Sequence, residues 1–152
     1  MEKKILLILI GMIMILAACS EEKVIKEREN QSKMNNIDSI YKDGDISISI
    51  SVSQERYDQG ETPVVIIRND GETPVDYTGL GTSLEYLQDN VWVAADDAVT
   101  EDKLNVLEPG KKMDQKFPQS YIQQKGVYRI VFKFHADRNK ESKKIAVSFY
   151  VD

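Results

Sequence analysis

The chain offers few side chains that could carry out covalent chemistry. Its 152 residues include one histidine, His135, and one cysteine, Cys19. A catalytic triad needs a histidine beside a nucleophile and a carboxylate, and zinc sites draw mainly on several Cys and His side chains. His135 shares the outward phase of an alternating segment with Arg129 and Lys133, and the spacing gives it no triad partners. We therefore expect no catalytic residue, no zinc, no cofactor and no enzymatic activity.

An acidic cluster is the best candidate for a metal ion. Asp96, Asp97, Glu101 and Asp102 fall in one predicted loop, and carboxylate oxygens are ligands that Ca²⁺ accepts. Charged clusters are usually just solvated surface, so the cluster is a weak calcium candidate. An envelope hydrolase that uses Glu101 or Asp102 is less well supported, because paired catalytic carboxylates need a defined separation across a cleft. A small domain without long loops provides little cleft.

The first twenty residues predict where the protein works. Lys3 and Lys4 precede an apolar run, and Leu16-Ala17-Ala18-Cys19 ends it with small residues and the single cysteine. This order is typical of a secretory signal segment, and the apolar run is shorter than the roughly 20 residues that span a membrane. The last four residues resemble a bacterial lipobox, which implies cleavage between Ala18 and Cys19 and acylation of Cys19.

Acylation would hold the mature chain on the extracytoplasmic face of the cell membrane. Two acyl chains give stable anchoring, whereas one gives only marginal binding. Loss of residues 1–18 removes Glu2, Lys3 and Lys4, so the net charge changes from −5 to −6. An acidic chain argues against nucleic-acid binding and against docking on anionic headgroups. We expect a membrane partner through the lipid, no nucleic acid, and an unidentified envelope protein or wall polymer as ligand.

The remaining chain divides into a polar segment and a strand-rich domain. Residues 19–44 are polar and charged, which predicts a flexible tether behind the lipidated cysteine. From residue 45 the pattern changes, because Ile46, Ile48, Ile50 and Val52 alternate with serines. This period of two predicts a strand with one face buried. We therefore expect a signal segment at 1–18, a tether at 19–44 and one domain at 45–152.

Further alternating segments fill this domain. In residues 126–135, Tyr128, Ile130, Phe132 and Phe134 share one phase, and residues 144–151 alternate in the same way. Other strands are expected near 64–68, 74–78, 83–88 and 91–93 and around Met113 and Phe117. Seven or eight short strands separated by Gly, Pro and Asn turns predict an all-β antiparallel sandwich. The Asp89-Asn90 pair is expected to close a hairpin, since both residue types tolerate positive φ.

Several short motifs carry a family resemblance. They are Tyr57-(x)2-Gly60-Glu61, Arg68-Asn69, Leu84-Glu85, Trp92, Leu107-(x)-Pro109-Gly110 and Gly126-(x)-Tyr128-Arg129-Ile130. In this order, over residues 46–152, they resemble a bacterial immunoglobulin-like domain of small lipoproteins and surface proteins of Gram-positive bacteria. A looser likeness is to the BsuPI-type intracellular proteinase inhibitors. The resemblance implies an immunoglobulin-like β-sandwich but little about function, because sandwiches host many unrelated roles.

The resulting hypothesis is a non-enzymatic interaction module at the cell envelope. Tyr77 and Tyr150 are expected to be exposed and to make contacts, together with the acidic cluster Asp96, Asp97, Glu101 and Asp102. Aromatic side chains suit this role because they provide a large contact area. Trp92 is expected to pack inside the sandwich, and Tyr128 to lie in the core or to bond back to a loop.

Two further expectations concern edges and loops. The serine-faced segment 45–53 is a sheet edge that is either open to strand addition or blunted by its polar side chains. The alternative function is a surface proteinase inhibitor, in which loop 78–82 or loop 96–105 enters a protease cleft. A cytoplasmic inhibitor would not carry Cys19 and its signal segment.

Overall fold

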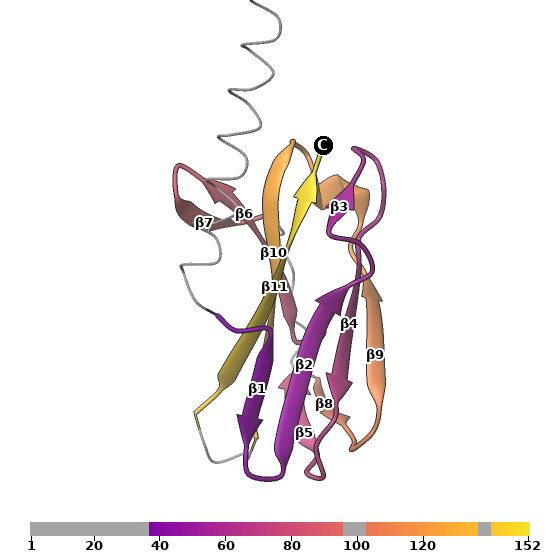
Figure 1. Cartoon of the computed structure of the whole chain (residues 1–152), viewed down its shortest axis with the longest axis vertical. Helices are drawn as coiled ribbons and strands as arrows, with labels where there is room; N and C mark the ends of the chain where they lie inside the picture. Colours follow the sequence, from indigo (N-terminus) through magenta and orange to yellow (C-terminus); the bar gives the residue numbers. More distant parts are fainter. Residues whose placement is uncertain (1–36, 96–102, 137–140) are drawn as a thin grey trace, which may run out of the picture.

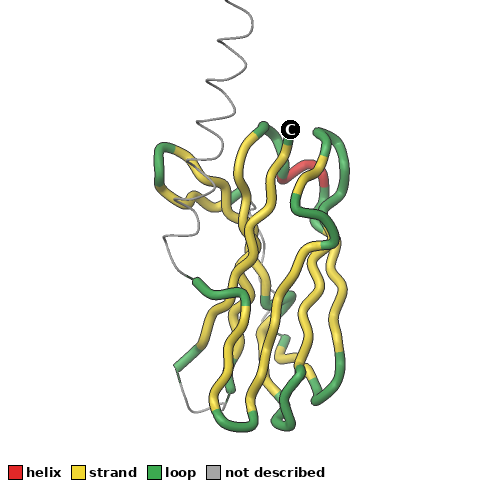
Figure 2. The backbone as a smooth tube through the Cα atoms, viewed as in Figure 1, coloured by secondary structure: helices red, strands yellow, loops and turns green. Residues whose placement is uncertain are grey.

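The computed structural model describes residues 37–95, 103–136 and 141–152. The predictions for Ala18 and Cys19, and those for Asp96, Asp97, Glu101 and Asp102, lie outside these residues. The described part is built from strands, with one short 3₁₀ helix at Gln119–Tyr121 (Figure 2). None of its helices is long and apolar enough to cross a membrane.

Two sheets form the sandwich, and all of their strand pairs are antiparallel except the parallel pair β3–β11 (Figure 1). The first has the order β1-β2-β4-β9, with bounds Ile40–Asp43, Ile46–Val52, Val64–Asn69 and Lys112–Lys116. The second has the order β3-β11-β10-β6-β7, with bounds Arg56–Tyr57, Lys143–Val151, Gly126–Phe134, Thr82–Gln88 and Val91–Ala94. The short strands β5, Val75–Thr78, and β8, Leu104–Leu107, pair separately. The predicted all-β immunoglobulin-like sandwich is confirmed.

Alternation along the strands determines the core. Ile48 and Ile50 of β2 are buried, while the serines that alternate with them point away from the core. In β10, four aromatic or branched side chains of one phase are no more than 1 % exposed: Tyr128, Ile130, Phe132 and Phe134. A strand's side chains alternate between its two faces, so the intervening residues of β10 point to the outer face of the five-stranded sheet. The predicted phases of β2 and β10 are therefore confirmed.

Tyr128 combines the two roles expected for it. Its ring is buried and stacks on Phe149, with ring centroids 5.6 Å apart. Its hydroxyl donates to Gln124 O at 2.8 Å, just before β10 begins. This is the geometry of a tyrosine corner, which ties a loop to the sandwich. Burial raises the pKa of the phenol, so the neutral, hydrogen-bonding form is favoured.

The hairpin between β6 and β7 closes as the residue types predict. Asp89 and Asn90 have φ values of 48° and 66°. Two consecutive positive φ values are those of a type I′ turn, whose twist matches that of the flanking strands. In Figure 1 this hairpin projects sideways from the body of the sandwich.

Three short strands were not expected, and one expected edge is wrong. β1 lies within the segment predicted as tether, β3 lies where no strand was predicted, and β8 lies partly within a predicted loop. β1 pairs with β2 from Asp43↔Ile46 to Ile40↔Ser49, while β4 pairs with the other side of β2. The serine-faced strand therefore lies inside the sheet and is no edge along most of its length.

Candidate functional site

A row of side chains crosses the outer face of the five-stranded sheet near the C-terminus. Arg56 of β3 lies opposite Tyr150 of β11, and Tyr150 lies opposite Val127 of β10. Farther along the row, Leu87 of β6 lies opposite Trp92 of β7. Val127, Leu87 and Tyr150 are buried although they face away from the main core, and Trp92 packs against them. We call these residues, together with Arg129, the arginine–aromatic row.

One end of the row is an arginine stacked on tryptophan. The Arg129 guanidinium carbon lies 4.2 Å from the centroid of the Trp92 ring. Arg129 Nε also donates to Glu85 Oε2, and Arg129 and Glu85 are direct cross-strand partners. The side chains are only 12 % and 26 % exposed, so the guanidinium is held between a carboxylate and a ring. Such stacking is favourable because the ring face attracts the cation.

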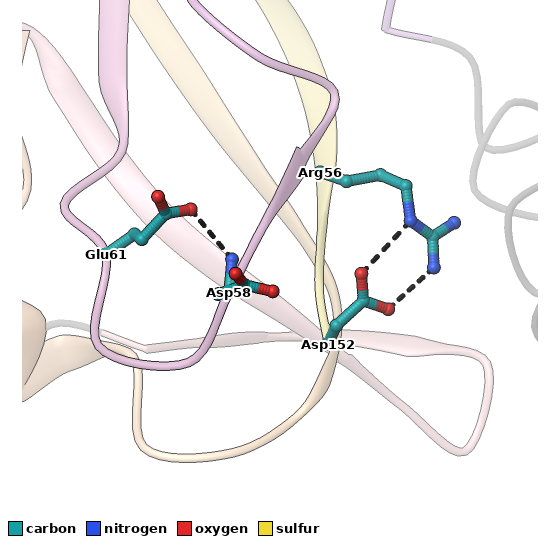
Figure 3. Close-up of polar contacts among 4 residues, drawn as sticks. All are labelled: Arg56, Asp58, Glu61 and Asp152. Atoms are coloured by element: carbon teal, nitrogen blue, oxygen red, sulfur yellow. Dashed lines mark hydrogen bonds and ion pairs between the residues drawn. The ribbon is translucent and has the colours of Figure 1, made fainter.

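The other end repeats the arrangement with tyrosine. The Arg56 guanidinium carbon lies 4.4 Å from the Tyr150 ring centroid. Arg56 also donates twice to Asp152, from Nε at 3.2 Å and from Nη2 at 2.6 Å (Figure 3). Each arginine of the row is thus oriented by one carboxylate, and each covers one aromatic ring.

The stability that the Arg56–Asp152 pair contributes depends on pH. The hydrogen bonds from Arg56 lower the pKa of Asp152 below its ordinary value of 3.8. The pair therefore stabilises the fold above that value, and this contribution is lost as the pH falls through the lowered pKa. Both side chains are about half exposed, so the contribution to stability is small. Its main effect is to orient the guanidinium over Tyr150.

The loop that follows β3 is held by its own hydrogen bonds. Asp58 N–H donates to Glu61 Oε2 at 2.8 Å (Figure 3), and Glu61 N–H donates to Asp58 O at 3.0 Å. Tyr57 is buried at the base of this loop, and its carbonyl accepts from Asp152 N–H at 3.0 Å. The loop and the C-terminus therefore support the Arg56 end of the row.

The residues singled out in the sequence lie at different places in the structure and differ in exposure. Tyr150 is 8 % exposed, so its expected exposure is wrong; Arg56 covers it. Tyr77 of β5 is half-buried and packs edge-on against Phe132, with ring centroids 5.6 Å apart. Trp92 is half-buried, but it packs on the outer face and not between the sheets. His135 is half-buried, and its backbone pairs with Asp76.

The turn from Thr78 to Thr82 is compact. Gly79 N–H donates to Lys103 O at 2.8 Å, and Gly81 N–H donates to Thr78 O at 2.9 Å. Asn105 Nδ2 donates to Gly79 O at 2.8 Å. Leu80, at the tip, is 62 % exposed. The hydrogen-bonded backbone of this turn thus presents the apolar side chain of Leu80 to solvent.

The described residues offer a surface that is suited to binding. They include no group of three or more His, Cys, Asp or Glu side chains that could hold a metal ion. The arginine–aromatic row provides planar cationic and aromatic surfaces, and arginine, tryptophan and tyrosine are enriched among residues that dominate binding energies. Beside it, Val91 and Val93 of the projecting hairpin are 63 % and 42 % exposed.

A family model described as a bacterial Ig-like domain matches residues 44–150. The chain belongs to this family. Membership supports a surface-type binding module. No curated protein matches this bacterial Ig-like domain.

Solved structures similar to this bacterial Ig-like domain include parts of larger proteins. A β-glucosidase from Listeria innocua is 13 % identical, with a TM-score of 0.35, covering 73 % of this chain and 17 % of that one. Spo0M, a sporulation control protein from Bacillus subtilis, is 13 % identical, with a TM-score of 0.41 and coverages of 72 % and 50 %. A family 123 glycoside hydrolase from Clostridium perfringens is 10 % identical, with a TM-score of 0.36 and coverages of 68 % and 27 %. The chain therefore spans half or less of each of these proteins.

Sequence reasoning missed the two arginines of the row. Arg129 was expected to face outward, but nothing in its local sequence indicates that Trp92 lies across the sheet from it. The stack depends on the register of β10, β6 and β7, which brings Arg129 opposite Glu85 and Trp92 opposite Leu87. A usable signal was the presence of arginine on the outward phase of the most apolar strand of this bacterial Ig-like domain.

Proposed function

We propose that this chain is a membrane-anchored extracytoplasmic lipoprotein whose Ig-like domain is a non-enzymatic binding module at the cell envelope. The lipobox-like Leu16-Ala17-Ala18-Cys19 supports the anchor, and the family supports the binding role. The ligand is an envelope protein or a wall polymer. The cell is a Gram-positive bacterium, as the sequence resemblance implies.

The arginine–aromatic row is the contact surface in this proposal, and its two arginine–ring stacks are the observation that carries it. Strands present such a row without any change in the core, because the opposite face of the same strands packs the sandwich. The two carboxylates hold the guanidinium groups in place before binding, which reduces the entropy lost on association. The neighbouring exposed valines extend the surface along the projecting hairpin.

The anchor can be tested by metabolic labelling with an alkyne-tagged palmitate. Cys19→Ala is expected to abolish incorporation of the label, because the chain contains no other cysteine. Ser20→Ala changes the adjacent residue and should leave labelling intact. Label in Cys19→Ala, or none in the unaltered protein, would contradict the anchor.

Binding through the row can be tested with the single tryptophan, because Trp92 is the only one in the chain. Purified wall polymer or an isolated envelope partner that binds there should change Trp92 fluorescence, and Arg129→Met should weaken its binding at least tenfold. Lys133→Met is the matched control: Lys133 is an exposed cation on the outward phase of the same strand. Equal affinities of the two variants would contradict a role for the row.

The compact Thr78–Thr82 turn favours the proteinase-inhibitor alternative. A protease-inhibition assay distinguishes this alternative from binding through the row. A secreted protease that is inhibited by the chain should lose this inhibition in Leu80→Asp and keep it in Arg129→Met. The reverse pattern would favour the arginine–aromatic row.

A further inference from the structure

A groove of about 390 Å³ lies between the end of β2 and the outer edge of β11. Its lining includes three serines and one glutamate, Ser39, Ser51, Ser148 and Glu55. The rest of the lining is apolar or aromatic: Ile50, Val52, Val127, Val147, Phe149 and Tyr150. This volume is within the range of small-ligand sites in proteins.

The edge of β11 is unpaired where it borders the groove. On either side of it, two other segments accept hydrogen bonds from the strand: Ala146 N–H donates to Asp38 O at 3.0 Å, and Tyr150 N–H donates to Glu55 O at 2.8 Å. Ser148 lies between these residues and has the same orientation, because alternate residues of a strand bond to the same side. Its backbone N–H and C=O therefore face the groove. No backbone group of the described residues pairs with them on this side.

The facing strand is unpaired at the same level. Ile50 N–H donates to Ser39 O at 2.9 Å, and this is the last bond on that side of β2. Val52 is two residues farther along, so its N–H points the same way. The groove thus lies between two short stretches of open strand edge, one from each sheet.

Open strand edges bind extended polypeptide, because the main chain of a peptide can supply the missing hydrogen bonds. The apolar lining suits one side chain of such a peptide. Glu55 adds a charge preference: it is exposed, and its carboxylate has no ion pair or hydrogen bond within the described residues. Glu55 is also the one charged residue of the lining.

We propose that this groove binds a short extended peptide segment of a partner protein through the backbone of Ser148, with a basic side chain of the peptide beside Glu55. The open edge favours a peptide over a sugar, since a sugar does not need a strand edge. The groove shares Val127 and Tyr150 with the arginine–aromatic row, whereas Glu55 and Ser51 line the groove alone. Substitution of Glu55 therefore tests the groove separately from the row.

The unpaired edge can be examined first, without any ligand. In the ¹⁵N-labelled full chain in detergent micelles, the amide of Ser148 should exchange with solvent at least tenfold faster than those of Ala146 and Tyr150. Equal protection of the three amides would show that the edge is already covered, and it would overturn the proposal.

Binding is then measured by titration with two defined probes, acetyl-Val-Lys-Val-Lys-Val-amide and acetyl-Val-Glu-Val-Glu-Val-amide. The lysine peptide should shift the amide signals of Ser148 and Val52 in a saturable way and bind at least tenfold more tightly than the glutamate peptide. Glu55→Gln should reduce this preference to less than threefold. Glu72→Gln, which removes an exposed carboxylate beyond the far end of β2, should leave it unchanged.

Three results would overturn the proposal. The first is the absence of a Ser148 shift at millimolar lysine peptide, and the second is equal affinity for the two peptides. The third is a shift of the Ser148 and Val52 signals with chitotriose but not with the lysine peptide. Each of these is independent of Arg129→Met, which is expected to affect binding to the row and to leave the peptide titration unchanged.

Discussion

Replacing Gly81 by alanine is expected to lower the free energy of unfolding by about 2–5 kcal/mol. Gly81 has φ of +68°, and a left-handed conformation costs an L-residue roughly 1–2 kcal/mol. An added Cβ would also lie 2.5 Å from Phe132 Cε2 and 2.8 Å from Tyr77 Cδ2. Overpacking of this kind costs about 1–3 kcal/mol more.

Gly110→Ala is a matched control for the conformational part of this effect. Gly110 has φ of +69°, but a Cβ there would meet no atom within 4 Å. It should therefore destabilise the domain by only about 1–2 kcal/mol. Urea unfolding of both variants, followed by circular dichroism, measures the difference. If the two variants are equally stable, the contacts of an added Cβ with Phe132 and Tyr77 do not contribute to the cost of replacing Gly81.

The effect at Gly81 follows from a close approach that the local sequence does not reveal. Thr78-Gly79-Leu80-Gly81-Thr82 indicates a turn on composition alone. The need for glycine arises because β6 and β10 pair side by side, with Thr82 opposite Phe132. The ring of Phe132 then lies beneath the turn, and Tyr77 of β5 closes the other side.

The main strands could be predicted because each buries one face. In β2, β10 and β11 the apolar residues recur with a period of two, and this period alone determines which side chains enter the core. β1, β3 and β8 could not be predicted in this way. β3 is two residues long, and three of the four residues of β1 and two of the four residues of β8 are exposed. Their positions depend on backbone pairing with a neighbouring strand, to which their own composition contributes little.

The candidate site was less predictable than the fold, for a related reason. Tyr150 was expected to be exposed. It does lie on the outer face of the last strand, but a side chain on the outer face is not always an exposed one. Arg56 is 94 residues away in sequence from Tyr150 and covers it only because β3 pairs in parallel with β11. The same holds for Arg129 and Trp92, which come from two strands that are not direct neighbours.

Asn69→Ala is expected to destabilise the domain by about 2–4 kcal/mol. The side chain of Asn69 is fully buried at the end of β4. Its Nδ2 donates to Thr73 O and to Leu107 O, both at 2.9 Å, and its Oδ1 accepts from Gly71 N–H at 3.0 Å. Alanine would leave these backbone groups without a partner, and each buried unpaired polar group costs roughly 1–3 kcal/mol.

Asn105→Ala tests whether burial, and not the loss of an amide as such, determines the cost at Asn69. Asn105 Nδ2 donates to Gly79 O at 2.8 Å, but the residue is only half-buried, so water can replace the amide. We expect a loss of about 0.5–1.5 kcal/mol for this variant in the same urea measurement. An equal loss in both variants would mean that the Asn69 network contributes no more than a surface hydrogen bond. The larger loss at Asn69 would show that one buried amide joins the end of β4, the turn after it and the end of β8.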